Sequence, residues 1–316
     1  MINKTTIWNH ILQTMNAFAP FYRQQANCNL RKLQARHVWL PLLKTAGVTP
    51  APLTVETFVA STPYIASHRR RAMLDDALDH GLLAADKPSR YRLTNQGKRA
   101  LSAFFDCAQE AIAAAPVLPD AQMEQLAELL ERIVLATERL PLPRSKTNFE
   151  SSRWTDPGPQ AAPAVRVDQY LTDLMHFRED AHLASWQAYD IDGRSWEAFT
   201  YIWRDEANTL SDLAERLARR GYNEDDYARA VHDLRNKGWI EQAAGRWQIS
   251  ASGRALRGVA EMVTDRLFYA GWQVLDEADL HRLNTLLINL SRRLTQAQIE
   301  DQNLAAVETQ PAAVIA

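Results

Sequence analysis

The sequence predicts a mainly helical protein built from two similar units, each with a small antiparallel β-hairpin. The evidence is a repeat, since residues 81–101 and 238–256 carry the same signals in the same order. Each stretch has a glycine that ends a helix, two short apolar strands around a turn, and a hydroxyl residue (Thr94 or Ser250) three residues before another glycine. A repeat spaced by half the chain indicates two units in one polypeptide, and this order of elements is typical of a winged helix.

Composition excludes several classes of protein. The chain has 316 residues, 46% hydrophobic and 23% charged, which suits two globular domains. It has no apolar run long enough to cross a bilayer and no basic N-terminal region before an apolar stretch, so we expect a cytoplasmic protein without a membrane partner. Cys28 and Cys107 form no CxxC pair, which argues against disulfides and cysteine-bound zinc. The net charge of −2 means that local charge must carry any DNA binding.

The spacing of apolar residues and the signals for helix starts and ends divide the chain into four parts. We predict a first unit over residues 1–140, a Pro/Ser-rich linker over 141–164, a second unit over 165–294 and a flexible tail over 295–316. The expected helices of the first unit cover 5–25, 30–46, 54–61, 65–80, 95–115 and 120–140. Those of the second cover 165–189, 195–205, 209–220, 223–237, 252–270 and 275–294.

The second unit carries a family resemblance. The segment T-L-S-D-L-A-E-R-L-A-R-R-G-Y-N-E-D-D-Y-A-R-A-V-H-D-L-R-N-K-G-W-I-E, followed by W-Q-I-S-A-S-G-R-A-L, resembles the MarR family of bacterial regulators. The first unit is similar more loosely. MarR-like proteins act as homodimers joined by their first and last helices, so the resemblance implies a covalent pseudo-dimer of two winged-helix units. We therefore expect the long outer helices to pack together and the chain to be a monomer.

Cationic side chains in the first unit point to DNA. The expected second helix of its helix-turn-helix places Arg69 on the outward face, with neighbouring cations on the flanks, and an Arg can read guanine or bind phosphate. The alternative is a solvated charge cluster paired with Asp75, Asp76 and Asp79. The predicted DNA-binding residues, including two in the hairpin, are His68, Arg69, Arg70, Arg71, Lys87 and Arg90.

The corresponding helix of the second unit has a different outward face. With its apolar residues inward, it presents Asp225, Arg229, Asp233 and Asn236 to a groove, with Asp226 on the flank. Three carboxylates on or beside this face oppose a polyanion. An N-cap at Asn223 and the helix dipole explain the acidic first turn without DNA. We therefore expect the first unit to make most DNA contacts.

Aromatic residues on the first helix of each unit are candidates for a ligand pocket. In MarR-like proteins small aromatic ligands bind between the dimerisation helices and the DNA-binding lobe, and aromatic side chains with a histidine suit such a site. Packing in an aromatic core is the alternative, and periodicity does not separate the two. The predicted ligand-binding residues are Phe18, Phe21, Tyr22, Phe177, His182 and Trp186.

No pattern indicates catalysis, a metal or a cofactor. His176 and His182 are six residues apart, unlike the i, i+4 pair of a helical zinc site. GxSxG, HExxH and glycine-rich phosphate loops are absent. The sequence therefore favours a ligand-responsive DNA-binding transcription regulator. The alternative is a module that binds a small molecule or a protein and has lost DNA binding.

Overall fold

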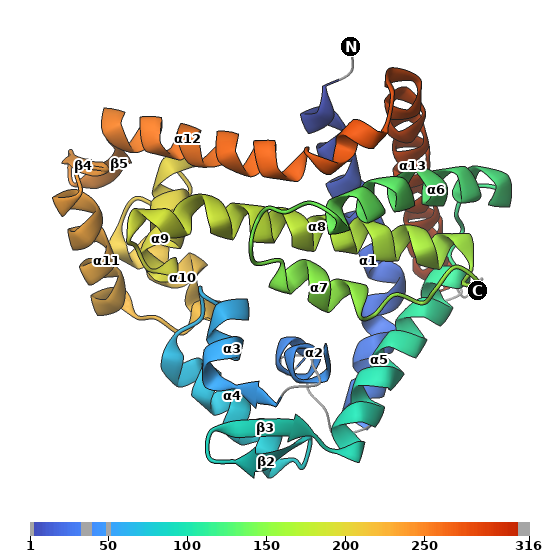
Figure 1. The fold of residues 1–316 in the computed structure, drawn as a ribbon, viewed down its shortest axis with the longest axis horizontal. Helices are drawn as coiled ribbons and strands as arrows, with labels where there is room; N and C mark the ends of the chain where they lie inside the picture. Colours follow the sequence, from blue (N-terminus) through green and yellow to red (C-terminus); the bar gives the residue numbers. More distant parts are fainter. Residues whose placement is uncertain (1–2, 33–39, 49–51, 309–316) are drawn as a thin grey trace, which may run out of the picture.

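The computed structural model describes residues 3–32, 40–48 and 52–308, and this part of the chain is mainly helical with two small antiparallel sheets (Figure 1). The buried hydrophobic residues form three clusters, one in a central helical core and one in each of two smaller lobes. None of the helices in these ranges has the length and apolar character needed to cross a membrane.

The first lobe places a pair of helices beside a three-stranded sheet of order β1-β3-β2. Thr54 caps α3 by accepting the Thr57 N–H, so the chain turns directly from strand to helix. Phe58 and Leu74 fill the space between the helices and the sheet. The elements are α2 (Leu40–Val48), β1 (Leu53–Thr54), α3 (Val55–Ser61), α4 (Ser67–Asp79), β2 (Leu83–Lys87) and β3 (Arg90–Leu93).

The second lobe repeats the order of two helices followed by a hairpin. Capping boxes at Thr209 and Asn223 begin its α10 and α11, as expected for the helix starts. Its hydrophobic cluster is richer in aromatic residues, with Trp196, Phe199 and Trp239 packed together. The elements are α9 (Gly193–Trp203), α10 (Leu210–Arg216), a 3₁₀ turn η3 (Ala218–Arg220), α11 (Glu224–Asn236), β4 (Ile240–Ala243) and β5 (Arg246–Ile249).

The glycines of the repeated motif allow a close approach of backbone to backbone. A Cβ on Gly97 would lie 2.2 Å from the Leu82 carbonyl oxygen, and one on Gly253 would lie 2.0 Å from that of Trp239. Only glycine fits there. The hydroxyl three residues before each glycine accepts the glycine N–H, which begins the long helix.

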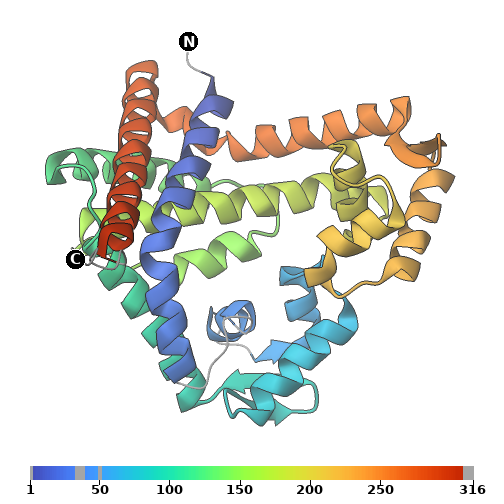
Figure 2. The same cartoon turned by 180° about the vertical axis from the view of Figure 1, so that it is seen from behind.

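Both halves of the chain contribute helices to the central core. In Figures 1 and 2, α8 and α12 run side by side toward the second lobe, while α1 lies against α13. Thr14 on α1 donates to the Leu287 carbonyl oxygen on α13 at 3.3 Å. The core elements are α1 (Lys4–Lys32), α5 (Asn95–Ala113), α6 (Asp120–Glu138), α7 (Thr147–Arg153), α8 (Pro163–Trp186), η2 (Gln187–Tyr189), α12 (Ala251–Phe268), η4 (Gly271–Val274) and α13 (Glu277–Glu308).

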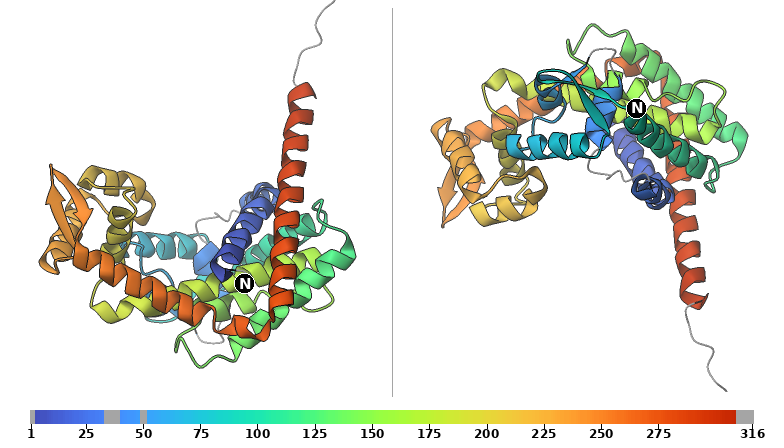
Figure 3. Two further views of the ribbon diagram at one scale, coloured as in Figure 1. Left: turned by 90° about the horizontal axis from the view of Figure 1, so that it is seen from above. Right: turned by 90° about the horizontal axis from the view of Figure 1, so that it is seen from below.

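Three of the predicted boundaries are wrong. The segment 141–164 is not a simple linker, because it contains α7, whose Phe149 is 1% exposed in the central core. The segment 295–316 is not a flexible tail throughout, since α13 continues to Glu308 and projects from the body (Figure 3). The helix expected over 30–46 is divided between α1 and α2, and residues 33–39 lie outside the described ranges.

Candidate functional site

Cationic side chains on α4 and on the β2–β3 hairpin form the first candidate surface. His68 and Arg71 are exposed on α4, and Lys87 and Arg90 are exposed on the hairpin. Among the described residues, Arg71, Lys87 and Arg90 form no ion pair with a carboxylate. Their charges are therefore available to an anionic partner, as the sequence predicts.

Arg70 does not belong to this surface, contrary to the prediction. It is 8% exposed and donates to the carbonyl oxygens of Thr62 (2.8 Å) and Ile65 in the loop before α4. Burial lowers the pKa of Arg70. The side chain thus folds back to hold the loop that joins the two helices, and the prediction of a DNA contact at Arg70 is wrong.

The loop before α4 also joins the two lobes. The Ala66 N–H donates to the Arg220 carbonyl oxygen at 2.8 Å, although these residues belong to different lobes. Gly193 lies against this loop so closely that a Cβ there would be 2.5 Å from the Pro63 carbonyl oxygen. We call this the lobe–lobe contact.

Arg69 takes part in the lobe–lobe contact and is only partly exposed. A Cβ on Gly221 would lie 3.0 Å from Arg69 Cδ and 3.4 Å from His68 Nε2, so both side chains pack against this glycine. The N-terminal ends of α4 and α11 therefore face each other (Figure 1). A DNA groove cannot reach the inner side of Arg69 while this contact is closed.

The outward face of α11 is acidic, as predicted. Tyr227, Val231 and Leu234 are buried, while Asp225 and Asp233 are exposed. The hairpin of this lobe has one cation, Arg246, and its guanidinium donates to the Asn208 side-chain oxygen. This cation thus serves the lobe's own structure.

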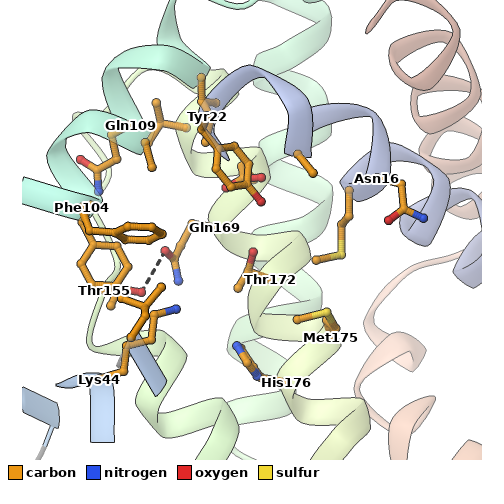
Figure 4. Close-up of a pocket in the computed structure, with 18 of the residues that line it drawn as sticks. Asn16, Tyr22, Lys44, Phe104, Gln109, Thr155, Gln169, Thr172, Met175 and His176 are labelled. Atoms are coloured by element: carbon orange, nitrogen blue, oxygen red, sulfur yellow. Dashed lines mark hydrogen bonds between the residues drawn. The ribbon is translucent and has the colours of Figure 1, made fainter. Parts of the chain in front are cut away.

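A first pocket of about 430 Å³ lies between the first lobe and the central core (Figure 4). Helices α1, α2, α5 and α8 line it, with Thr155 at one side. Its walls are mostly apolar and include Tyr22 and Phe104, while Lys44 and His176 point toward the cavity (Figure 4). An enclosed apolar space with few polar groups is typical of a small-molecule site.

Two opposite charges in this pocket are held in a poorly solvated environment. Burial lowers the pKa of Lys44, and the Asp168 carboxylate partly offsets that effect. Burial raises the pKa of Asp168 to about 7. Burial, followed by the Lys44 charge, lowers the pKa of His176 to about 4, so this imidazole is neutral at pH 7.

A second pocket, of about 610 Å³, lies between the second lobe and the core. It is lined by α8, α9 and α12, together with Trp8 of α1, Tyr64 of the loop before α4 and Arg220 of η3. The two pockets use comparable elements, since α1, α2 and α5 begin and end the first unit as α8, α9 and α12 do the second. Charged side chains replace apolar ones in the second pocket.

Sequence counting supports this correspondence. Phe105 and Ala108 stand eight and eleven residues after Gly97, and both line the first pocket. Glu261 and Thr264 stand at the same distances after Gly253 and line the second.

The predicted ligand-binding aromatics are divided between core and pockets. Phe18 and Phe177 are 0% exposed in the central cluster, and Phe21 packs against it, so these three are core residues and the prediction for them is wrong. Trp186 is 2% exposed and stacks on Trp196 with ring centroids 5.6 Å apart, so it too is core.

Tyr22 and His182 do line cavities, but different ones. Tyr22 lines the first pocket and His182 the second. The Trp196 indole N–H donates to His182 Nε2 at 3.1 Å, which leaves the imidazole proton on Nδ1.

Sequence reasoning missed the charged residues of both pockets. Lys44 is the one charged residue of α2, and Asp168 is one of six on α8, so nothing in the sequence links two positions so far apart in the chain. Arg257 carried a readable signal, because it stands four residues after Gly253 where the first unit has Leu101. A charged residue at an apolar position of a repeat marks a difference in function between the copies.

Comparison with known proteins identifies the family. Residues 96–301 match a helix-turn-helix family, which is more than half of the chain. The protein belongs to this helix-turn-helix family. The matched region runs from α5 into α13 and includes the α10–α11 pair. No curated protein and no solved structure matches the chain. Membership in the family indicates, in general terms, a DNA-binding regulator.

Proposed function

We propose that the protein is a ligand-responsive DNA-binding transcription regulator in which the first lobe makes most contacts with DNA. The observation that carries this proposal is the set of exposed, unpaired cations on α4 and the adjacent hairpin, namely Arg71, Lys87 and Arg90. A helix-turn-helix with a basic hairpin suits a duplex, because the cations neutralise phosphates beside the groove that the helix enters.

The proposed architecture is a pair of MarR-like winged-helix units within one chain. Its support is the repeated order of helices and hairpin, the matching caps at Thr94 and Ser250, and the single core that the outer helices share. In this architecture the chain acts as a monomer that replaces a homodimer.

The first pocket is the proposed site of ligand response. It joins α2 of the first lobe to α1, α5 and α8, so an occupant contacts both the lobe and the core. A ligand that binds one lobe position more tightly than another shifts the equilibrium between them. The apolar walls and Lys44 suit a small aromatic acid, whose anion would accept from the ammonium group.

A second candidate function, a binding module without DNA affinity, is favoured by the lobe–lobe contact. That contact covers one side of Arg69, and the α11 face is acidic. In this alternative both lobes serve only to enclose the pockets.

Salt-dependent binding to duplex DNA separates the two candidates. Fluorescence anisotropy with a random-sequence duplex at 50 and 200 mM salt should show affinity that falls steeply with salt. A variant combining Arg71→Gln, Lys87→Gln and Arg90→Gln should bind at least tenfold more weakly, with the log–log salt slope reduced by about 0.9 for each lost phosphate contact.

The matched control combines Arg139→Gln, Arg144→Gln and Arg292→Gln, which removes the same charge from exposed positions of the central core. Its affinity should change little. Equal loss in both variants, or no salt-dependent binding by the parent protein, would favour the binding module.

A further inference from the structure

The second pocket contains three guanidinium groups on one side. Arg178 and Arg257 come from α8 and α12, Arg204 directly follows α9, and all three line the cavity. Each has a carboxylate neighbour. Asp265 and Glu261 are more exposed than their partners Arg178 and Arg257, whereas Arg204 is more exposed than Glu206. Arg178 and Arg257 are therefore the cations of the inner wall, and Arg204 lies nearer the solvent.

These groups keep unused hydrogen-bonding capacity. Nε and Nη1 of Arg257 have no hydrogen-bond partner among the described residues. Arg178 Nη1 lies 2.9 Å from Asp265 Oδ1, but without the alignment of a hydrogen bond. A buried guanidinium with unpartnered N–H groups is costly unless an anion binds it.

Aromatic rings hold the guanidinium groups in place. Arg257 lies 4.8 Å from the ring centroids of both Trp196 and Trp203, and Arg178 lies 5.2 Å from that of Trp8. These contacts hold Arg257 and Arg178 against aromatic surface, which favours the charged form of each side chain. The same positive surroundings act on His182, whose pKa falls to about 3 through burial first and then through Arg257, Arg178 and Arg204.

The opposite side of the pocket is negative. Glu197 is bound by the Arg220 guanidinium at 2.6 Å, but Glu179 forms no hydrogen bond or ion pair within the described chain. Burial, together with Asp180, raises the pKa of Glu179. Glu179 is thus a partly exposed carboxylate without an ion pair of its own among the described residues, although the Arg220 charge acts to lower its pKa.

Both kinds of charge reach the pocket from neighbouring positions of α8, since Arg178 and Glu179 are adjacent in sequence and both line it. His182 follows three residues after Glu179, about 4.5 Å further along the helix axis. An α-amino acid carries its carboxylate and its ammonium group on the same carbon atom, so it can contact two oppositely charged groups that are close together. Tyr201 and Tyr64 add aromatic surface for a flat side chain.

We infer that the second pocket binds an aromatic α-amino acid, with its carboxylate on the Arg178, Arg204 and Arg257 side and its ammonium group on Glu179. This site is separate from the first pocket and does not depend on DNA binding. The ligand carries both charges, because Arg257 keeps N–H groups without a hydrogen-bond partner and Glu179 has no ion pair among the described residues.

Three probes that share a phenyl ring test the inference by isothermal titration calorimetry on the full chain. L-Phenylalanine carries both charges, 3-phenylpropanoate only the carboxylate and phenethylamine only the ammonium group. L-Phenylalanine should bind at least tenfold more tightly than either analogue. Equal binding of the carboxylate analogue, or no heat of binding with 10 mM L-phenylalanine, would overturn the inference.

Two substitutions assign the binding to this pocket. Glu179→Gln should weaken the binding of L-phenylalanine at least tenfold without weakening the binding of 3-phenylpropanoate. Arg204→Gln, at a half-exposed position, should weaken the binding of both compounds. The controls Glu215→Gln and Arg254→Gln change the same charges at exposed positions outside the pocket and should leave both affinities unchanged. Melting temperatures establish that each variant is folded. Unaltered L-phenylalanine binding by Glu179→Gln would contradict the proposed orientation.

Discussion

Replacing Gly193 by alanine should weaken the lobe–lobe contact and little else. Gly193 begins α9, and the added Cβ would lie 2.5 Å from the Pro63 carbonyl oxygen and 2.8 Å from the carbonyl carbon. Both atoms belong to the backbone of the loop before α4, so rotation of a side chain cannot relieve the clash. The loop has to move away from α9, and the Ala66–Arg220 hydrogen bond should lengthen with it.

The expected cost follows from opposing effects. Overpacking a well-filled site costs about 1–3 kcal/mol, and a lost hydrogen bond adds about 0.5–1.5 kcal/mol. Alanine in place of glycine in a helix stabilises the folded state by about 0.5–1 kcal/mol. The free energy of unfolding should therefore fall by about 1–3 kcal/mol, with the overpacking contribution deciding the sign.

Gly258→Ala is the matched control. Gly258 is exposed within α12, and a Cβ there would meet nothing within 4 Å. The same chemical change should then stabilise the protein by about 0.5–1 kcal/mol.

Urea unfolding followed by tryptophan fluorescence compares the two variants. The midpoint should move down for Gly193→Ala and up for Gly258→Ala, at similar m-values. If Gly193→Ala proved as stable as Gly258→Ala, the reasoning would fail, because the lobes would then not be in contact in solution.

Three further outcomes are expected. Trp186→Ala should cost about 3–5 kcal/mol of stability, because the ring is buried against Trp196. A fall in melting temperature of less than 1 °C in differential scanning calorimetry would contradict this prediction. Arg70→Ala should destabilise by about 1–3 kcal/mol by leaving loop carbonyls unpaired, whereas exposed Arg71→Ala should have almost no effect on the same urea midpoint. The pKa of His182 is depressed to about 3, so between pH 6.5 and 3 the imidazole takes up a proton only in the unfolded state, and the free energy of unfolding should fall as the pH falls. His182→Gln should reduce the slope of the free energy of unfolding against pH by up to one proton. Identical slopes for the variant and the parent protein would refute this prediction.

Local features of the fold were readable from the sequence. The period of α11 correctly places Tyr227 and Val231 inside and Asp225 outside, because a helix beside one core has one apolar face. The Asn223 cap was equally predictable, since it depends on residues three apart.

Features that depend on tertiary packing were not readable. Arg70 looks like its exposed neighbours in sequence, but its bonds to Thr62 and Ile65 depend on how the preceding loop turns. A core aromatic such as Phe18 and a pocket aromatic such as Tyr22 share one helix and one period. Only the positions of α5 and α8 decide which of them faces a cavity.

The pairing of α1 with α13 determines the order in which the protein can be completed on the ribosome. The hydrogen bonds Thr14–Leu287 and His10–Asn284 join residues separated by 273 and 274 positions, so α1 has to wait for nearly the whole chain. Each lobe closes over much shorter separations and can form earlier. Ile7 and Ile11 of α1 are 0% exposed in the finished fold. Until α13 leaves the ribosome, α1 cannot bury its apolar side chains against that helix. Nascent chains stalled before α13 should therefore bind chaperones that recognise apolar helices, and should release them once α13 is made.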